Sequence, residues 1–166
     1  MTTFFRFDGS DFKIEPSSNF GHAYLMALGV YRGQPFVTGD HLSSSLGLKT
    51  EILDYSSKQW NVAADYPFSS GDRWIYFWII LFFTSIVFSI SHYATTSTEE
   101  SVYIIGGWTN DPQTANKSSI IAEYRNGQWY IAGNLNQSRH AHGAITAGSL
   151  TMVIGGTSAD GQPLVF

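Results

Sequence analysis

The chain has 166 residues, of which 43% are hydrophobic and 16% aromatic, so it can form a packed core and is not a disordered tail. Its net charge is −4, and its nine Lys and Arg residues form no cluster, which argues against a nucleic-acid-binding protein. The absence of cysteine excludes a disulfide scaffold, a cysteine-ligated zinc site and a cysteine nucleophile.

Residues 1–19 predict a hairpin. Arg6 and Asp8 interrupt what would have to be the apolar core of a secretory signal peptide, so the segment is not interpreted as one. The short runs FFRF and FKIE flank Asp8-Gly9, and Asp-Gly is typical of tight hairpin turns. We interpret residues 1–19 as half of a repeat, formed by two outer strands.

Residues 20–73 show an all-β pattern. Two apolar runs in YLMALGVYRGQPFVTG flank a turn at Arg32–Pro35, because Gly and Pro commonly interrupt strands. After the polar loop His41–Thr50, EILDYSSKQWNVAA predicts a second pair of strands across Ser56–Lys58. The region therefore predicts four strands and forms a first complete repeat.

Residues 74–90 interrupt this pattern with seventeen residues that carry no charge. Their number is near the lower limit for a membrane-spanning helix, and Trp is common at membrane interfaces. The residues that mark the possible membrane segment are Trp74, Trp78, Ile80, Phe83 and Ile90. The sequence therefore predicts an inserted hydrophobic helix, which would make the chain a membrane protein if it crosses a bilayer and a cytoplasmic one otherwise.

The insertion begins at Trp74 and ends at Ser89, because its removal leaves Arg73 three residues before His92. Sixteen helical residues extend about 24 Å, whereas the ends of such a short extended segment lie about 10 Å apart. Two alternatives stay open: a true transmembrane helix, or a translated non-coding insertion, since the composition also suits a pyrimidine-rich tract. In both cases we expect a helix that projects from the junction between two repeats.

Residues 91–139 predict a second complete repeat. One hairpin is expected to turn at Thr98–Ser101 and another at Asn126-Gly127. The second turn would place Tyr124 opposite Trp129, so we expect this aromatic pair to be buried and the neighbouring polar pair to be exposed.

Residues 140–166 predict a truncated repeat. A hairpin around Ala147–Ser149 repeats the first hairpin of the preceding unit, and the chain stops before any counterpart of Tyr124 or Trp129.

One set of residues recurs through these units. Gly106-Gly107 returns at Gly155-Gly156, which gives a period of 155 − 106 = 49 residues, and self-similarity at a fixed period is the mark of a repeat. Tyr and Trp recur five residues apart, and Phe7 and Phe12 have the same separation near the N-terminus. The repeat marks are Gly39, Gly106, Gly107, Gly155, Gly156, Tyr55, Tyr124, Trp60, Trp129, Arg73, Arg139, His22, His92 and His142.

This set resembles the kelch motif, whose period is near 50 residues. The resemblance implies an all-β fold, an incomplete β-propeller of kelch-like four-stranded blades, interrupted by the one hydrophobic helical segment. It also implies that the paired glycines end an inner strand and that the tryptophan packs between blades. Propellers contain four to eight blades, so we expect the chain to be a fragment of a larger propeller.

The resemblance and the loops together predict a non-enzymatic protein–protein interaction module. The loops His41–Thr50 and Trp108–Ser119 would present a variable surface to an unidentified partner protein, because binding residues commonly lie on loops held by a rigid scaffold. No nucleic-acid partner is expected, and membrane contact is expected only through residues 74–90. The alternatives are a single-pass membrane protein with kelch repeats and a fragment of a propeller enzyme of the oxidase or glycosidase type.

The sequence nominates no catalytic residue, cofactor or metal site. His140 and His142 with Asp160 offer metal-ligating groups, but His142 is also the histidine of the repeat and is interpreted as structural. The enzyme alternative would require His22, His92 and His142 to converge on one cavity.

Overall fold

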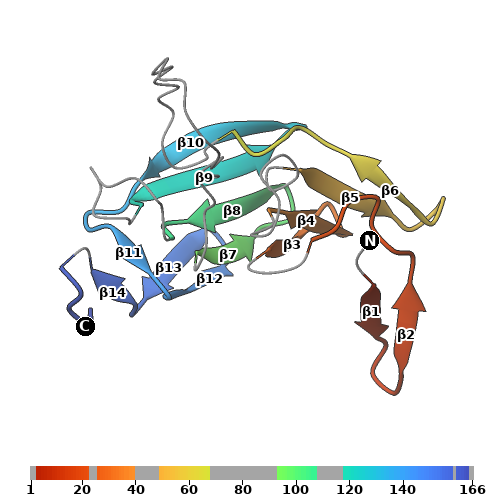
Figure 1. Ribbon diagram of the computed structural model, residues 1–166, viewed down its shortest axis with the longest axis horizontal. Helices are drawn as coiled ribbons and strands as arrows, with labels where there is room; N and C mark the ends of the chain where they lie inside the picture. The colour runs from red at the N-terminus through yellow and green to blue at the C-terminus, as the bar shows by residue number, and fades with distance from the viewer. Residues whose placement is uncertain are drawn as a thin grey trace, which may run out of the picture.

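The computed structural model describes residues 3–22, 26–39, 49–67, 93–107, 118–158 and 160–164. The regular structure within these ranges is all β, in antiparallel sheets without a helix (Figure 1). Residues 74–90, predicted to form the inserted helix, lie outside the described residues, as do Arg73 and His92. Within the described ranges, no helix is sufficiently long and apolar to cross a membrane.

The N-terminal hairpin comprises β1 (Phe4–Phe7) and β2 (Phe12–Glu15) and confirms the predicted turn. The Asp8 carboxylate accepts hydrogen bonds from the backbone nitrogens of Ser10 and Asp11 at 3.1 and 3.0 Å. Gly9 adopts a positive φ of 103°, which a glycine accommodates without strain. The turn is therefore stabilised by its own residues.

Sheet 1 is an antiparallel meander of β3 (Ala27–Tyr31), β4 (Gln34–Thr38), β5 (Thr50–Asp54) and β6 (Gln59–Val62). The turn between β3 and β4 has only two residues, Arg32-Gly33, with φ values of 50° and 74°. Two positive φ values identify the hairpin turn that suits strand twist. Gln34 and Pro35, predicted to be turn residues, instead belong to β4.

Sheet 2 has the same order of strands: β7 (Ala94–Ser97), β8 (Ser101–Ile105), β9 (Ile120–Arg125) and β10 (Gln128–Asn134). The predicted turn at Asn126-Gly127 is confirmed, with φ values of 51° and 80°. Tyr124 lies opposite Trp129 and is buried, while Trp129 is half-buried. Arg125 and Gln128 lie opposite one another and are exposed, as expected.

The C-terminal hairpin comprises β12 (Gly143–Ala147) and β13 (Leu150–Ile154), which turn at Gly148-Ser149. Beside it, β11 (Arg139–His140) pairs with β14 (Thr157–Ser158). The predicted hairpin is thus present.

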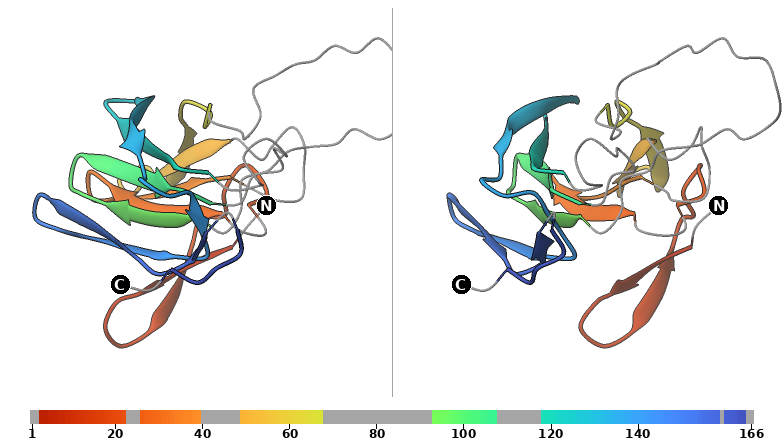
Figure 2. Two further views of the ribbon diagram at one scale, coloured as in Figure 1. Left: turned by 90° about the vertical axis from the view of Figure 1, so that its left-hand side faces the viewer. Right: turned by 60° about the vertical axis from the view of Figure 1, so that its left-hand side comes forward.

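Sheet 1, sheet 2 and the C-terminal hairpin stack through their first strands, which are β3, β7 and β12. β3 lies beside β7 and β7 beside β12, and Figure 2 shows the units side by side. The hydroxyl group of Thr96 on β7 donates to that of Thr146 on β12 at 2.9 Å. Between sheets 1 and 2, Tyr31 and Phe36 pack against Val102 and Tyr124. The sheets follow the order expected of propeller blades, but the described residues show no closed ring.

Candidate functional site

Trp129 joins sheet 2 to sheet 1. Its ring centroid lies 4.8 Å from that of Tyr66 and 6.0 Å from that of Phe36. Its indole Nε1 donates to the backbone carbonyl of Ala64, 3.0 Å away, in the chain that leaves β6. Trp129 therefore packs between the two sheets.

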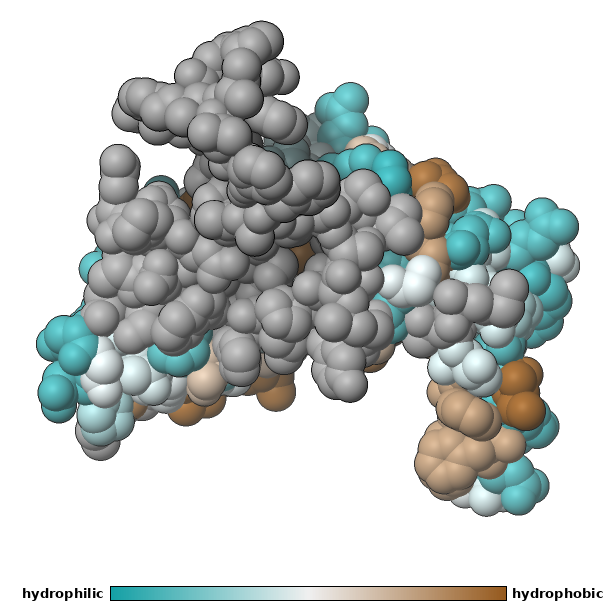
Figure 3. Space-filling view, viewed as in Figure 1, coloured by the Kyte–Doolittle hydropathy of each residue, from teal (hydrophilic) through white to brown (hydrophobic). Residues whose placement is uncertain are grey.

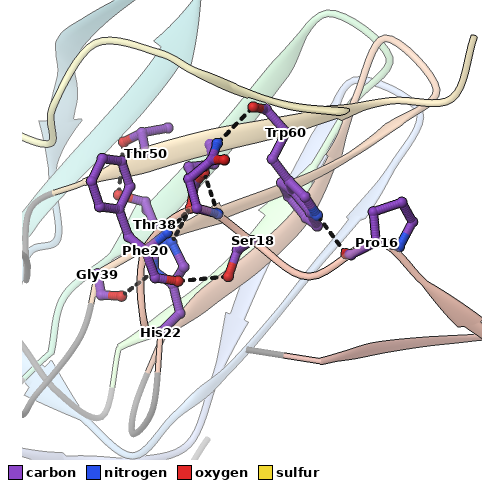
Figure 4. Close-up of polar contacts among 10 residues, drawn as sticks. Pro16, Ser18, Phe20, His22, Thr38, Gly39, Thr50 and Trp60 are labelled. Carbon is purple, nitrogen blue, oxygen red and sulfur yellow. Dashed lines mark hydrogen bonds and ion pairs between the residues drawn. The ribbon is translucent and has the colours of Figure 1, made fainter. Parts of the chain in front are cut away.

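Trp60 makes the same connection one unit earlier. Its Nε1 donates to the carbonyl of Pro16 at 2.7 Å (Figure 4). Its ring centroid lies 4.5 Å from that of Phe4. Pro16 lies 16 − 12 = 4 residues after Phe12, and Ala64 lies 64 − 60 = 4 residues after Trp60. In both junctions a tryptophan on the last strand of a sheet thus donates to a main-chain carbonyl four residues beyond an aromatic residue of the preceding hairpin.

Tyr55 does not occupy the position of Tyr124. Leu53 lies opposite Trp60 in the β5–β6 ladder, whereas Tyr55 begins the turn that follows β5. That turn has four residues, Tyr55–Lys58, where the corresponding turn of sheet 2 has two. The equal Tyr-to-Trp spacing therefore does not reflect an equal register, and the Tyr55 ring lies beneath the Lys58 ammonium, 4.9 Å away.

A buried polar network surrounds Glu51 on β5 (Figure 4). Its carboxylate is fully buried and accepts three N–H groups: the backbone nitrogens of Asn19 and Phe20 at 3.0 and 3.1 Å, and the Asn19 amide at 2.7 Å. His22 Nε2 lies 2.9 Å from Glu51 Oε2, and its Nδ1 lies 2.8 Å from the carbonyl oxygen of Gly39.

The hydrogen-bond geometry assigns this network a structural role. A carbonyl oxygen only accepts, so His22 Nδ1 donates its proton to Gly39. The network joins the segment before β3 to the ends of β4 and β5. Glu51 was missed in the sequence, although a carboxylate two residues before the inward-facing Leu53 was a usable signal.

His142 is enclosed by two of the repeat glycines. A Cβ atom added to Gly106 would lie 2.8 Å from His142 Cε1, and one added to Gly156 would lie 2.8 Å from His142 Cβ. Both glycines also have positive φ, at 60° and 91°. Burial, together with the neighbouring Arg139 charge, lowers the pKa of His142 from 6.5 to about 4. Its imidazole is therefore neutral near pH 7, and it fills space between strands.

Arg139 connects the C-terminal hairpin to sheet 2. Its carbonyl oxygen accepts the backbone N–H of Gly107 at 2.9 Å, and its guanidinium Nη1 donates to the carbonyl of Gly155 at 3.1 Å. The repeat marks Gly106, Gly107, Gly155 and Gly156 thus gather around Arg139 and His142, where two units meet.

The histidines of the repeat have separate surroundings. His22 contacts Gly39 and Glu51, whereas His142 lies against Gly106 and Gly156, and His92 is outside the described residues. The part of the chain that the structure describes holds no group of three His, Cys, Asp or Glu side chains able to bind a metal ion.

Each of the two predicted binding loops has a closed base, meaning that a backbone hydrogen bond joins the residues at its two ends. Gly39 N donates to Lys49 O at 3.3 Å, and Ser118 N donates to Gly107 O at 2.9 Å. At the first base the hydroxyl groups of Thr38 and Thr50 also form a hydrogen bond, at 2.8 Å. Between these bases, residues 40–48 and 108–117 lie outside the described residues. Each sheet thus holds the two ends of its loop a few ångströms apart.

The opposite end of the sheets is joined by Arg32. Its backbone N–H donates to the carbonyl of Glu99 at 2.9 Å, its Nε to the carboxylate of Glu100 at 2.9 Å, and its Nη2 to Asn126 Oδ1 at 3.1 Å. Three tight turns from two sheets therefore share one arginine. At one end of the sheets each loop base is closed by hydrogen bonds, and at the other end Arg32 joins the turns of sheets 1 and 2.

Comparisons with protein-family models and with curated proteins find no match to this chain.

Proposed function

We propose that this chain is a kelch-like, non-enzymatic interaction module that binds a partner protein at the loop end of its sheets. The observation that carries the proposal is the pair of closed loop bases, at Gly39 with Lys49 and at Gly107 with Ser118. They occupy equivalent positions in sheets 1 and 2, after the second strand and before the third. A scaffold that fixes loop ends while leaving loop composition free suits protein recognition.

The buried polar groups support this assignment. The Glu51 carboxylate accepts N–H groups from the chain itself, and His142 is held neutral by burial. Among the described residues these are fold-stabilising contacts, so we assign recognition to the loops and not to a reactive centre. The propeller arrangement, with partners bound by loops at one end of adjacent blades, is part of the same proposal.

The test replaces residues 41–48 and 108–117 with Gly-Ser linkers of equal length in the full chain. Partners captured by the unmodified chain would be identified, and their affinity for purified protein measured by calorimetry. We expect the loop replacements to abolish binding while the thermal unfolding midpoint stays unchanged. A matched control changes Ser56 and Ser57, in the turn at the other end of sheet 1, to glycine and should bind normally. Retained binding by the loop variant would contradict the proposal.

A further inference from the structure

The chain that joins sheet 1 to sheet 2 leaves and re-enters the fold in one core cluster. Tyr66 follows β6 and is buried with Ile104 of β8 and Ala122 of β9. Tyr93 precedes β7 and packs against the same cluster. Burial raises the pKa of both phenols, and the nearby Tyr66 raises that of Tyr93 further. The two ends of the connecting chain therefore lie close together.

The two sheets that this chain connects are in direct contact. The ring centroid of Phe36 in sheet 1 lies 5.0 Å from that of Tyr124 in sheet 2. A Cβ atom built on Gly29 of β3 would lie 3.0 Å from Cγ1 of Val102 on β8. The hydrocarbon core of a bilayer is about 30 Å thick, so these contacts cannot exist across a membrane.

The length of the connecting chain limits what it can cross. A chain whose two ends lie on one side of a bilayer crosses it an even number of times or not at all. Two helical crossings need about 20 residues each, whereas 93 − 67 − 1 = 25 residues separate Pro67 from Tyr93. An isolated pair of strands would leave backbone groups unpaired in the hydrocarbon. The connecting chain is therefore too short to cross and return.

We infer that sheets 1 and 2 lie on the same side of any lipid bilayer that the chain between them enters, so that this chain enters and leaves through one face. A single-pass membrane protein with one sheet on each side is incompatible with the shared core. The lipid partner is then a single leaflet, and both loop bases stay on the same side of it.

A second apolar surface decides how this inference is tested. Figure 3 shows that the N-terminal hairpin β1–β2 projects from the sheets and is apolar, and its exposed side chains are Phe5, Phe7, Phe12 and Ile14. Such a surface offers its own contact for lipid. Recovery of the chain with vesicles would therefore not identify the segment that binds, so the experiment measures the side on which each sheet lies.

A disulfide between the sheets reports whether they stay in contact. The chain contains no cysteine, and a Cβ atom built on Gly29 would lie 3.8 Å from Cβ of Val102, within the disulfide range of about 3.5–4.5 Å. The full chain with Gly29→Cys and Val102→Cys is synthesised with sealed vesicles of phosphatidylcholine and phosphatidylserine and is then oxidised. Remaining thiols are alkylated and counted by mass spectrometry in the floating and free fractions.

The control combines Gly29→Cys with Tyr130→Cys. Tyr130 is exposed on β10, two strands from β8 and so about 10 Å from Val102, beyond disulfide reach. We expect about tenfold more disulfide from the Gly29 and Val102 pair than from the control, in whichever fraction contains the chain. A disulfide that forms in the free fraction but not in the floating fraction would overturn the inference.

A matched pair of single variants reports the side directly. Val62 on β6 and Ile131 on β10 are both 57% exposed and belong to different sheets. Val62→Cys and Ile131→Cys, each prepared with the same vesicles, are labelled with a maleimide that does not cross membranes, before and after detergent. We expect equal labelling of the two variants at each stage. If one variant is labelled only after detergent, the sheets lie on opposite sides and the inference is wrong.

The contacts that carry this inference lie outside the two binding loops. Replacing residues 41–48 and 108–117 should therefore leave the disulfide and the labelling unchanged. Failure of partner binding and failure of the one-sided arrangement are thus separately measurable.

Discussion

The indole Nε1 of Trp129 donates a hydrogen bond to the backbone carbonyl of Ala64, and so fastens the outermost strand of sheet 2 to the chain that leaves sheet 1. The indole also contacts aromatic rings from both sheets, so we expect its removal to lower stability more than the removal of any other side chain at this junction.

Trp129→Ala should lower the free energy of unfolding by about 3 kcal/mol, at the low end of the range for large aromatic truncations because the ring is half-buried. Trp129→Phe should cost less, since it keeps an aromatic ring and loses only the N–H donor. Urea unfolding followed by circular dichroism measures both. Tyr130→Ala, on the exposed face of β10, is the control and should change stability little. A near-zero effect of Trp129→Ala would contradict the junction.

The contacts of Glu51 with His22 and of Glu100 with Arg32 should contribute very different amounts to stability. Glu51→Ala removes a fully buried acceptor and should cost about 3 to 5 kcal/mol, because the buried His22 and the backbone N–H of Asn19 lose their partner. Glu100→Ala removes an exposed partner of Arg32 and should cost less than about 1 kcal/mol. Chemical denaturation of both variants at the same pH compares them. Similar costs would mean that the Glu51 network is not closed to water.

Acid should destabilise the fold through His142. The folded-state pKa is about 4 against 6.5 for the ordinary side chain, so between these values the unfolded chain binds a proton that the folded chain does not. Stability is therefore unaffected above pH 6.5 and falls progressively as the pH drops toward 4. His142→Gln should flatten this part of the stability profile, measured by urea unfolding across pH. An unchanged slope in this variant would show that other groups cause the acid response.

Deletion of residues 74–89 should raise the soluble yield of the chain. These residues are apolar and uncharged, and a segment of this kind favours membrane insertion or aggregation. The deletion joins Arg73 to Ile90 and keeps the rest of the repeat. Soluble protein after centrifugation, compared between the full chain and the deletion, provides the measurement. A lower yield from the deletion would indicate that the segment supports the fold.

Local signals in the sequence predicted the strands well. Asn126-Gly127 set its hairpin and its register, because a two-residue turn with positive φ leaves one way to pair the flanking residues. The paired glycines after β8 and β13 were found through their period. The reason that glycine is needed there is visible only in the structure, where a Cβ atom at Gly106 or Gly156 would overlap with His142 and the neighbouring backbone.

Features that depend on distance along the chain were missed. Glu51 and His22 are 29 residues apart, and no pattern within either segment indicates that they meet. Tyr55 was aligned with Tyr124 because spacing alone cannot separate a four-residue turn from a two-residue turn with longer strands. The sharing of Arg32 by three turns likewise requires the sheets to be stacked first.

The tryptophan bonds end on main-chain oxygens, at Pro16 in one junction and Ala64 in the other. Every residue type carries this acceptor, so the accepting position is free to change during evolution while the bond persists. Only the donor must remain an indole. Repeats joined in this way need no particular side chain on the surface that receives the neighbouring tryptophan in order to keep this bond.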